Sequence, residues 1–60
     1  MFAYLFEIIG GNNKGERFFV KCNNLCEAWE IADENFPTDP LRCWSRYSIE
    51  DAEMTGLNIY

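Results

Sequence analysis

The chain contains no histidine, and this absence removes most familiar catalytic arrangements. Histidine is the usual activator of a serine or cysteine nucleophile, so neither a Ser-His nor a Cys-His pair can form. The carboxylates are expected on a convex, solvated helix face, an environment that does not adapt them to acid–base catalysis. We also expect a domain this small to lack a small-molecule pocket of several hundred cubic ångström. The sequence therefore predicts no enzymatic activity, no catalytic residues and no cofactor.

Cysteine is scarce and its count is odd: Cys22, Cys26 and Cys43. Structural zinc sites use four nitrogen or sulfur ligands, often with paired C-x-x-C spacing, which this chain lacks. An odd number of cysteines without a secretory signal is typical of free thiols in a reducing cytosol. We expect no metal site and a cytoplasmic location, with Cys22 and Cys43 as small buried apolar residues and Cys26 flanking them.

Long apolar runs are also missing. The opening MFAYLFEIIG is interrupted by Glu7 and has neither a basic start nor an A-x-A-like cleavage site, so we do not expect a signal peptide. No run reaches the roughly 18 apolar residues of a membrane helix. Yet 48% of the 60 residues are hydrophobic and 17% aromatic, more than disordered acidic chains carry. This composition predicts one small globular domain over residues 1–60, with a thin core.

Basic residues are few and unevenly placed. Residues 1–22 carry three basic and two acidic side chains, whereas residues 23–60 carry eight acidic side chains against Arg42 and Arg46. The formal net charge is −5. The protein is therefore expected to be small, acidic and electrically lopsided.

The segment GGNNKGER, Gly10 to Arg17, has the G-x-x-x-x-G spacing of a phosphate-binding loop. Such a loop needs a following lysine, a hydroxyl and a helix N-terminus, but Gly15 precedes Glu16, Arg17 and then a strand pattern. Apolar residues dominate 2–9 and 16–22 on either side, so the segment is predicted to be a hairpin loop. Pairing of Glu7 with Arg17 would give one sheet face containing Phe2, Tyr4, Phe6, Ile8, Phe18, Val20 and Cys22.

The remaining elements follow from capping residues and periodicity. Asn24 is predicted to cap a helix that ends near Asn35, before Pro37, with Leu25, Ala28, Trp29, Ala32 and Phe36 on its apolar face. Leu41 to Tyr47 alternates as a third strand. Ser48 and Gly56 bound a short helical turn over 49–55. Residues 57–60 are compatible with either an edge strand or a packed tail.

These elements predict an α+β fold. We expect a two-layer ββαβ arrangement, with an antiparallel three-stranded sheet in the order 2-1-3, one helix on one face and a short C-terminal helical turn. Whether a fourth, edge strand is present is left open.

One predicted partner-binding surface is the sheet face opposite the helix. Strand parity places basic and aromatic residues together there: Arg17, Phe19, Lys21, Arg42, Trp44 and Arg46. A protein partner or a second copy could cover these residues. Alternatively, Trp44 and Phe19 could stack on bases and make the protein a weak single-stranded nucleic-acid binder. We favour the protein interface, because a net charge of −5 repels a polyanion.

A second predicted surface is the acidic helix face, formed by Glu27, Glu30, Asp33, Glu34 and nearby Asp39. Such a face usually keeps a protein soluble. It could also dock a basic partner. In that case the protein could be a small acidic inhibitor, encoded by a phage or mobile element, of a nucleic-acid-binding protein. The leading hypothesis is a small, non-enzymatic protein-interaction module that uses the sheet face, the acidic helix face, or both.

Overall fold

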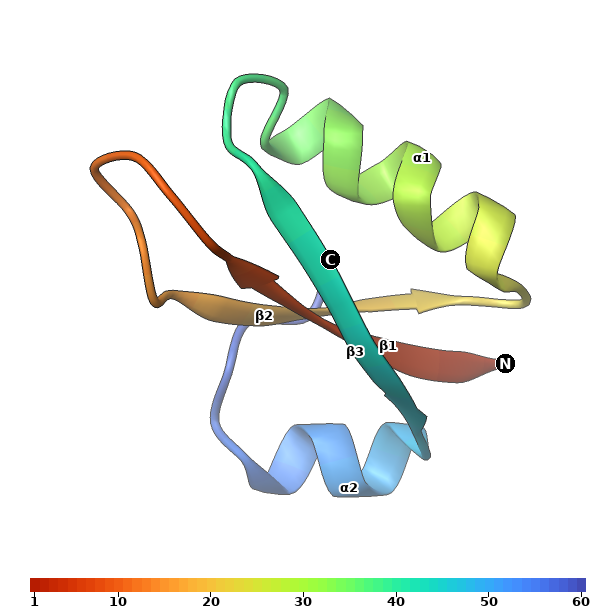
Figure 1. Ribbon diagram of the computed structural model, residues 1–60. Coiled ribbons are helices and arrows are strands. Elements are labelled where there is room, and N and C mark those ends of the chain that lie inside the picture. The colour runs from red at the N-terminus through yellow and green to blue at the C-terminus, as the bar shows by residue number, and fades with distance from the viewer.

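The computed structural model describes all 60 residues as a three-stranded antiparallel sheet with a helix on each face (Figure 1). The elements are β1 (Phe2–Ile8), β2 (Arg17–Cys22), α1 (Leu25–Asn35), β3 (Leu41–Tyr47) and α2 (Ile49–Met54). The strand order is β2-β1-β3, which confirms the predicted α+β fold and topology. Neither helix is long and apolar enough to cross a membrane.

The β1–β2 hairpin has the predicted register. Glu7 pairs with Arg17 and Phe6 pairs with Phe18. Gly15 donates its backbone N–H to the carbonyl of Ile8 over 2.7 Å and adopts a φ of 96°, a conformation that glycine reaches without a steric penalty. The loop chemistry therefore fixes which residues of β1 and β2 face each other.

The N-terminus of α1 is capped as predicted. The side-chain oxygen of Asn24 accepts a hydrogen bond from the backbone N–H of Glu27 over 2.9 Å. In return, Glu27 Oε2 accepts a hydrogen bond from Asn24 Nδ2 over 3.1 Å. This reciprocal pair satisfies a free helical N–H group and fixes where α1 begins.

The larger core lies between α1 and the sheet. Its buried members are Tyr4, Phe6, Ile8, Phe18, Val20, Cys22, Ala28 and Ala32. The half-buried Trp29 packs edge-on against Phe6, with ring centroids 5.0 Å apart, and Phe18 stacks on Phe36 at 4.4 Å. The predicted apolar stripe of α1 therefore does face the sheet, although Leu25, at the start of the helix, remains exposed.

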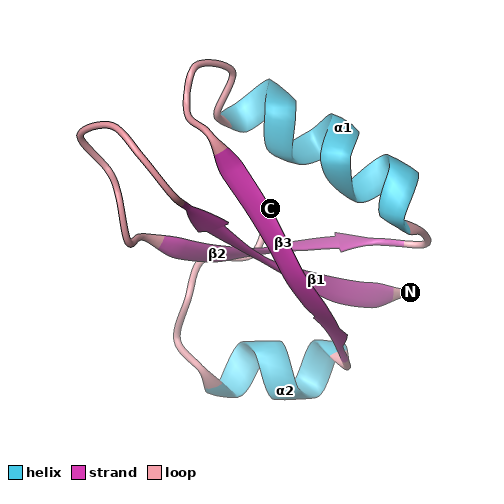
Figure 2. Cartoon of the chain, in the orientation of Figure 1, coloured by secondary structure: helices cyan, strands magenta, loops and turns pink.

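The second face of the sheet is covered, not open. Ser48 caps α2, which buries Ala52 against Ala3 and Phe19, and half-buried apolar residues surround this smaller core: Leu5, Ile49, Leu57 and Ile59. Phe19 is 2% exposed. The expectation that Phe19 lies on an exposed aromatic face is therefore wrong, because α2 lies on that side of the sheet (Figure 2) and apolar residues of α2 and of the tail pack against Phe19.

The C-terminal tail lies along the outer edge of β2. Ile59 forms a parallel bridge with Phe19, whose N–H donates to the carbonyl of Asn58 and whose carbonyl accepts from the N–H of Tyr60, both over 2.8 Å. The N–H of Lys21 then donates to the carbonyl of Tyr60 over 3.0 Å. The tail thus pairs with β2 as a short parallel edge segment, which decides the alternative that the sequence left open.

A bulge interrupts the pairing of β3 with β1. Phe6 pairs with Cys43 and the preceding residue, Leu5, pairs with Ser45, so that Trp44 is the extra residue. The predicted alternation holds up to Cys43 and is wrong beyond it, because the extra residue reverses which face each later side chain occupies. Ser45 and Tyr47 share the α2 side of the sheet, and Arg46 lies opposite Tyr4 on the α1 side.

Candidate interaction surface around Trp44

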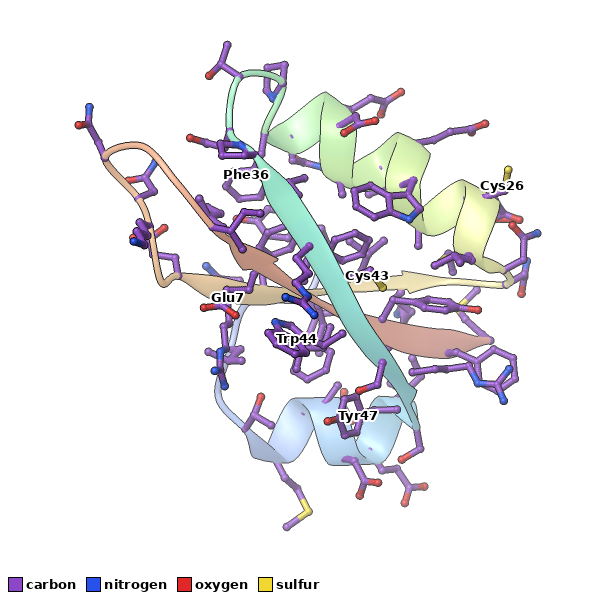
Figure 3. The ribbon with its side chains drawn as sticks, in the orientation of Figure 1. Glu7, Cys26, Phe36, Cys43, Trp44 and Tyr47 are labelled. Atoms are coloured by element: carbon purple, nitrogen blue, oxygen red, sulfur yellow. The ribbon has the colours of Figure 1, made fainter.

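Trp44 is the most prominent aromatic side chain on the surface of the sheet. It lies at the bulge in β3, which is an edge strand, and 48% of the residue is exposed. This confirms the expectation that its indole is partly exposed. Figure 3 shows Trp44 beside Glu7, with Tyr47 nearby toward α2. The bulge therefore presents a large aromatic ring at the rim of the sheet.

Two neighbours hold the Trp44 ring in place. Its indole Nε1 donates a hydrogen bond to Glu7 Oε1 over 2.7 Å. The guanidinium carbon of Arg42 lies 4.1 Å from the ring centroid, in the geometry of a cation–π contact. In the strand register, Glu7 lies opposite Arg17 of β2 and opposite Arg42 of β3. The exposed ring of Trp44 is therefore held beside a row of alternating charges that crosses the sheet.

A hollow of about 270 Å³ lies beside Trp44 on the α2 side of the sheet. It is lined by Leu5, Arg17, Trp44, Ser45 and Tyr47. Tyr47 is 40% exposed and packs edge-on against the buried Phe19, with centroids 5.7 Å apart. The hollow therefore combines aromatic walls with one cationic side chain.

A second hollow, of about 360 Å³, lies between the start of α1 and β3. It is lined by Tyr4, Leu25, Trp29, Cys43, Trp44, Ser45 and Arg46. Leu25 is 48% exposed, and the guanidinium carbon of Arg46 lies 4.3 Å from the ring centroid of Phe2. α1 packs mainly on β2 and β1, and this hollow opens between α1 and β3. The expectation that the domain has no small-molecule pocket stays a prediction.

The six predicted sheet-face residues are only partly brought together. Arg17, Arg42 and Trp44 surround Glu7, whereas Phe19 is buried and Arg46 lies on the opposite side. Lys21 is exposed on β2, next to the bound tail. The functional assignment of these residues stays a prediction, but a single continuous basic and aromatic face does not exist.

The predicted register already put Leu5 and Glu7 on the same sheet face as Arg17, and the structure confirms this, but neither residue was assigned a binding role. Sequence reasoning missed the other residues of this surface: Ser45, Tyr47, Leu25, Trp29 and Tyr4. No signal in the sequence marked Tyr47, because its position depends on the bulge.

The acidic residues of α1 are arranged along its solvent side. Glu30, Asp33 and Glu34 are exposed, and Asp39 is half-buried in the loop that follows α1. Glu27 differs from the others, because its carboxylate is engaged in capping the helix. The partner-binding role predicted for these residues stays a prediction.

The three thiols lie in different environments. Cys22 is buried and donates its S–H to the carbonyl of Asn24 over 3.2 Å, and burial raises the pKa of this thiol. Cys43 is half-buried, and its pKa is raised first by burial and then by the negative charge of ionised Cys22. Cys26 is exposed. No group of three or more Cys, Asp or Glu side chains is placed to hold a metal ion.

Comparison of the chain with protein-family models, with curated proteins and with solved structures found no match. The proposed function therefore rests on the surface residues of this chain.

Proposed function

We propose that this protein is a small, non-catalytic interaction module of the cytoplasm that binds a protein partner through the surface around Trp44. One observation carries the proposal: a half-exposed indole, fixed by Glu7 and Arg42, stands at the edge of the sheet between two hollows. The three free thiols support the reducing compartment.

The residue types on this surface are those that dominate protein interfaces. Tryptophan, tyrosine and arginine are enriched among residues whose truncation costs the most binding energy, and Trp44, Tyr47 and Arg42 meet here. A ring that already has one orientation loses less conformational entropy on binding. The Glu7 and Arg42 contacts therefore favour Trp44 as an anchor for a partner.

The same surface is poorly suited to single-stranded nucleic acid. Base-stacking platforms need several exposed aromatics and free cations along a groove. Phe19 is buried, and Arg46 lies on the opposite side of the sheet from Arg17 and Arg42, so the exposed aromatic and basic side chains do not line one groove.

The test compares Trp44→Ala with Glu30→Ala, a matched truncation of an exposed residue on the acidic helix. Each protein is immobilised and exposed to a lysate of the native host, and retained proteins are identified by mass spectrometry. We expect Trp44→Ala to lose a partner that the unchanged protein and Glu30→Ala both retain. Retention of the same partner by Trp44→Ala and its loss by Glu30→Ala would move the interface to the acidic helix.

The nucleic-acid alternative is tested by fluorescence in a Trp29→Phe background, so that Trp44 alone reports. We expect a thymidine oligonucleotide to leave the emission unchanged at physiological salt. Saturable quenching that weakens steeply as salt is added would contradict the proposal, because counterion release is characteristic of phosphate binding.

A further inference from the structure

The two edges of the sheet differ. The outer edge of β2 is covered by the tail of the same chain, through three backbone hydrogen bonds from residues 58–60 to Phe19 and Lys21. β3 forms the other edge, and no backbone hydrogen bond joins it to an element other than β1. The backbone N–H and C=O groups on the outer edge of β3 are therefore free to pair with an extended chain.

One hollow lies on each face of the sheet, and residues of β3 line both. Successive side chains of a strand point to opposite faces of a sheet. The hollow beside Tyr47 lies on the α2 side of β3, and the hollow beside Leu25 and Trp29 lies on the α1 side. Trp44 and Ser45 contribute to both. A strand paired with β3 could therefore place alternate side chains in the two hollows, which is how strand addition obtains specificity.

Charge indicates the chemistry of that strand. Arg42 and Arg46 flank Trp44 along β3 and are the two basic residues of residues 23–60. Arg17 lines the hollow on the α2 side. The exposed acids of α1 point to solvent, and this helix packs on β1 and β2. At physiological ionic strength, salt screens the charge of these acids beyond about 8 Å. The edge therefore favours a strand with carboxylates close to the arginines.

A second copy of the chain is a poor occupant of the same edge. Two copies that paired through β3 would have to form a regular ladder of backbone hydrogen bonds, and the bulge at Trp44 interrupts that ladder. A bulge and charged side chains such as Arg42 and Arg46 are features that protect an edge strand from self-association.

We propose that a partner adds an extended, acidic segment to the open edge of β3, with apolar side chains seated in the two hollows. This inference rests on the proposed function and specifies the form of its partner. The segment contributes main-chain hydrogen bonds to β3, an apolar or aromatic residue to the hollow between Leu25 and Trp29, and carboxylates near Arg42 and Arg46.

The experiment uses a displayed library of random peptides of about 10 residues, long enough to form one strand. Selected peptides are titrated into the ¹⁵N-labelled protein, and hydrogen exchange of the β3 amides is measured with and without peptide. We expect the selected peptides to combine acidic residues with alternating apolar residues and to protect β3 amides that exchange freely in the unbound protein. Arg46→Glu should weaken binding at least tenfold, whereas Lys14→Glu, the same charge reversal in the hairpin loop, should leave it unchanged.

Other outcomes separate the two proposals. Peptides that bind through Trp44 without protecting the β3 amides would overturn strand addition and leave the interaction module standing. Protection of β3 by self-association alone, seen in sedimentation as a dimer, would overturn the heterologous partner. Peptides that bind equally well to Trp44→Ala would overturn both the strand addition and the proposed surface.

Discussion

The indole nitrogen of Trp44 and the carboxylate of Glu7 are joined by a hydrogen bond of 2.7 Å, although the residues come from different strands. Glu7 belongs to the central strand and Trp44 to a bulge in the edge strand. The bond ties the extra residue of the bulge to the best-supported part of the sheet. The exposed aromatic ring is thereby held in place by the fold itself.

Replacing Glu7 should release this ring. In a Trp29→Phe background, Glu7→Ala should lower the fluorescence anisotropy of Trp44, because the indole loses its acceptor and turns more freely. We expect a cost of about 0.5 to 1.5 kcal/mol in the free energy of unfolding, the usual net contribution of one hydrogen bond. Time-resolved anisotropy and urea denaturation measure the two effects.

Glu7→Gln provides the matched control, since its amide oxygen can still accept the indole N–H. Anisotropy close to that of the unchanged protein is expected for Glu7→Gln. If Glu7→Ala were equally rigid, the ring would be held by Arg42 and packing alone.

The two tryptophans should contribute very differently to stability. Trp29 packs on Phe6 inside the larger core, so Trp29→Ala should cost about 3 kcal/mol, the lower end for such truncations because the ring is half-buried. Trp44→Ala should cost less, about 0.5 to 1.5 kcal/mol, because the main interaction it removes is the hydrogen bond to Glu7. Equal melting temperatures for the two variants would contradict the placement of Trp29.

The parts of the fold that could be predicted from sequence are those that local chemistry determines. Gly15 and the alternating residues around it fix the register of the hairpin, and Asn24 and Ser48 fix the starts of the two helices. Each signal lies within a few residues of the feature it specifies. The strand order could also be predicted, because the connection from β2 through α1 to β3 is short and allows few arrangements.

The candidate site was harder to predict, because it depends on one extra residue. Strand alternation has a period of two, so the bulge at Trp44 reverses every later position of β3. Nothing between Leu41 and Tyr47 distinguishes a bulged strand from a regular one. Arg46 and Tyr47 were consequently assigned to the wrong faces.

The burial of Phe19 did have a signal in the sequence. Ala52, Leu57 and Ile59 form an apolar set in the C-terminal stretch that must be buried somewhere, and the uncovered sheet face was the available place. Local periodicity cannot say which surface such a segment covers. The exposed face is therefore smaller than predicted, and the surface proposed to bind a partner lies at the edge of β3.

The thiols should differ in reactivity. At about pH 8, an aromatic disulfide reagent should modify the exposed Cys26 rapidly, while Cys22 and Cys43 react slowly until the protein is unfolded. Raised pKa values in the folded state leave fewer thiolates at these two positions. Mass spectrometry of the partly modified protein identifies which cysteine carries the label. Early modification of Cys22 would contradict its burial.

The same pKa shifts predict a loss of stability in alkali. A thiol whose pKa is raised by folding keeps its full contribution below the unfolded value, near 9, and loses it as the pH rises through the folded value. The free energy of unfolding, measured by urea denaturation, should therefore decrease more steeply above about pH 9 for the unchanged protein than for Cys22→Ala. Parallel curves for the two proteins would show that Cys22 ionises equally well in both states.

Removal of the tail should destabilise the protein and create a second open edge. Deleting residues 57–60 removes the cover of Phe19 and three backbone hydrogen bonds to β2, which together should cost at least about 3 kcal/mol. Because an unpaired edge promotes association, the shortened chain should also form oligomers whose proportion rises with concentration in sedimentation. Asn58→Ala is the control, since it keeps the backbone carbonyl that accepts from Phe19 and alters an exposed side chain. A shortened chain that stays monomeric and as stable as Asn58→Ala would mean that the tail neither covers Phe19 nor closes the β2 edge in solution.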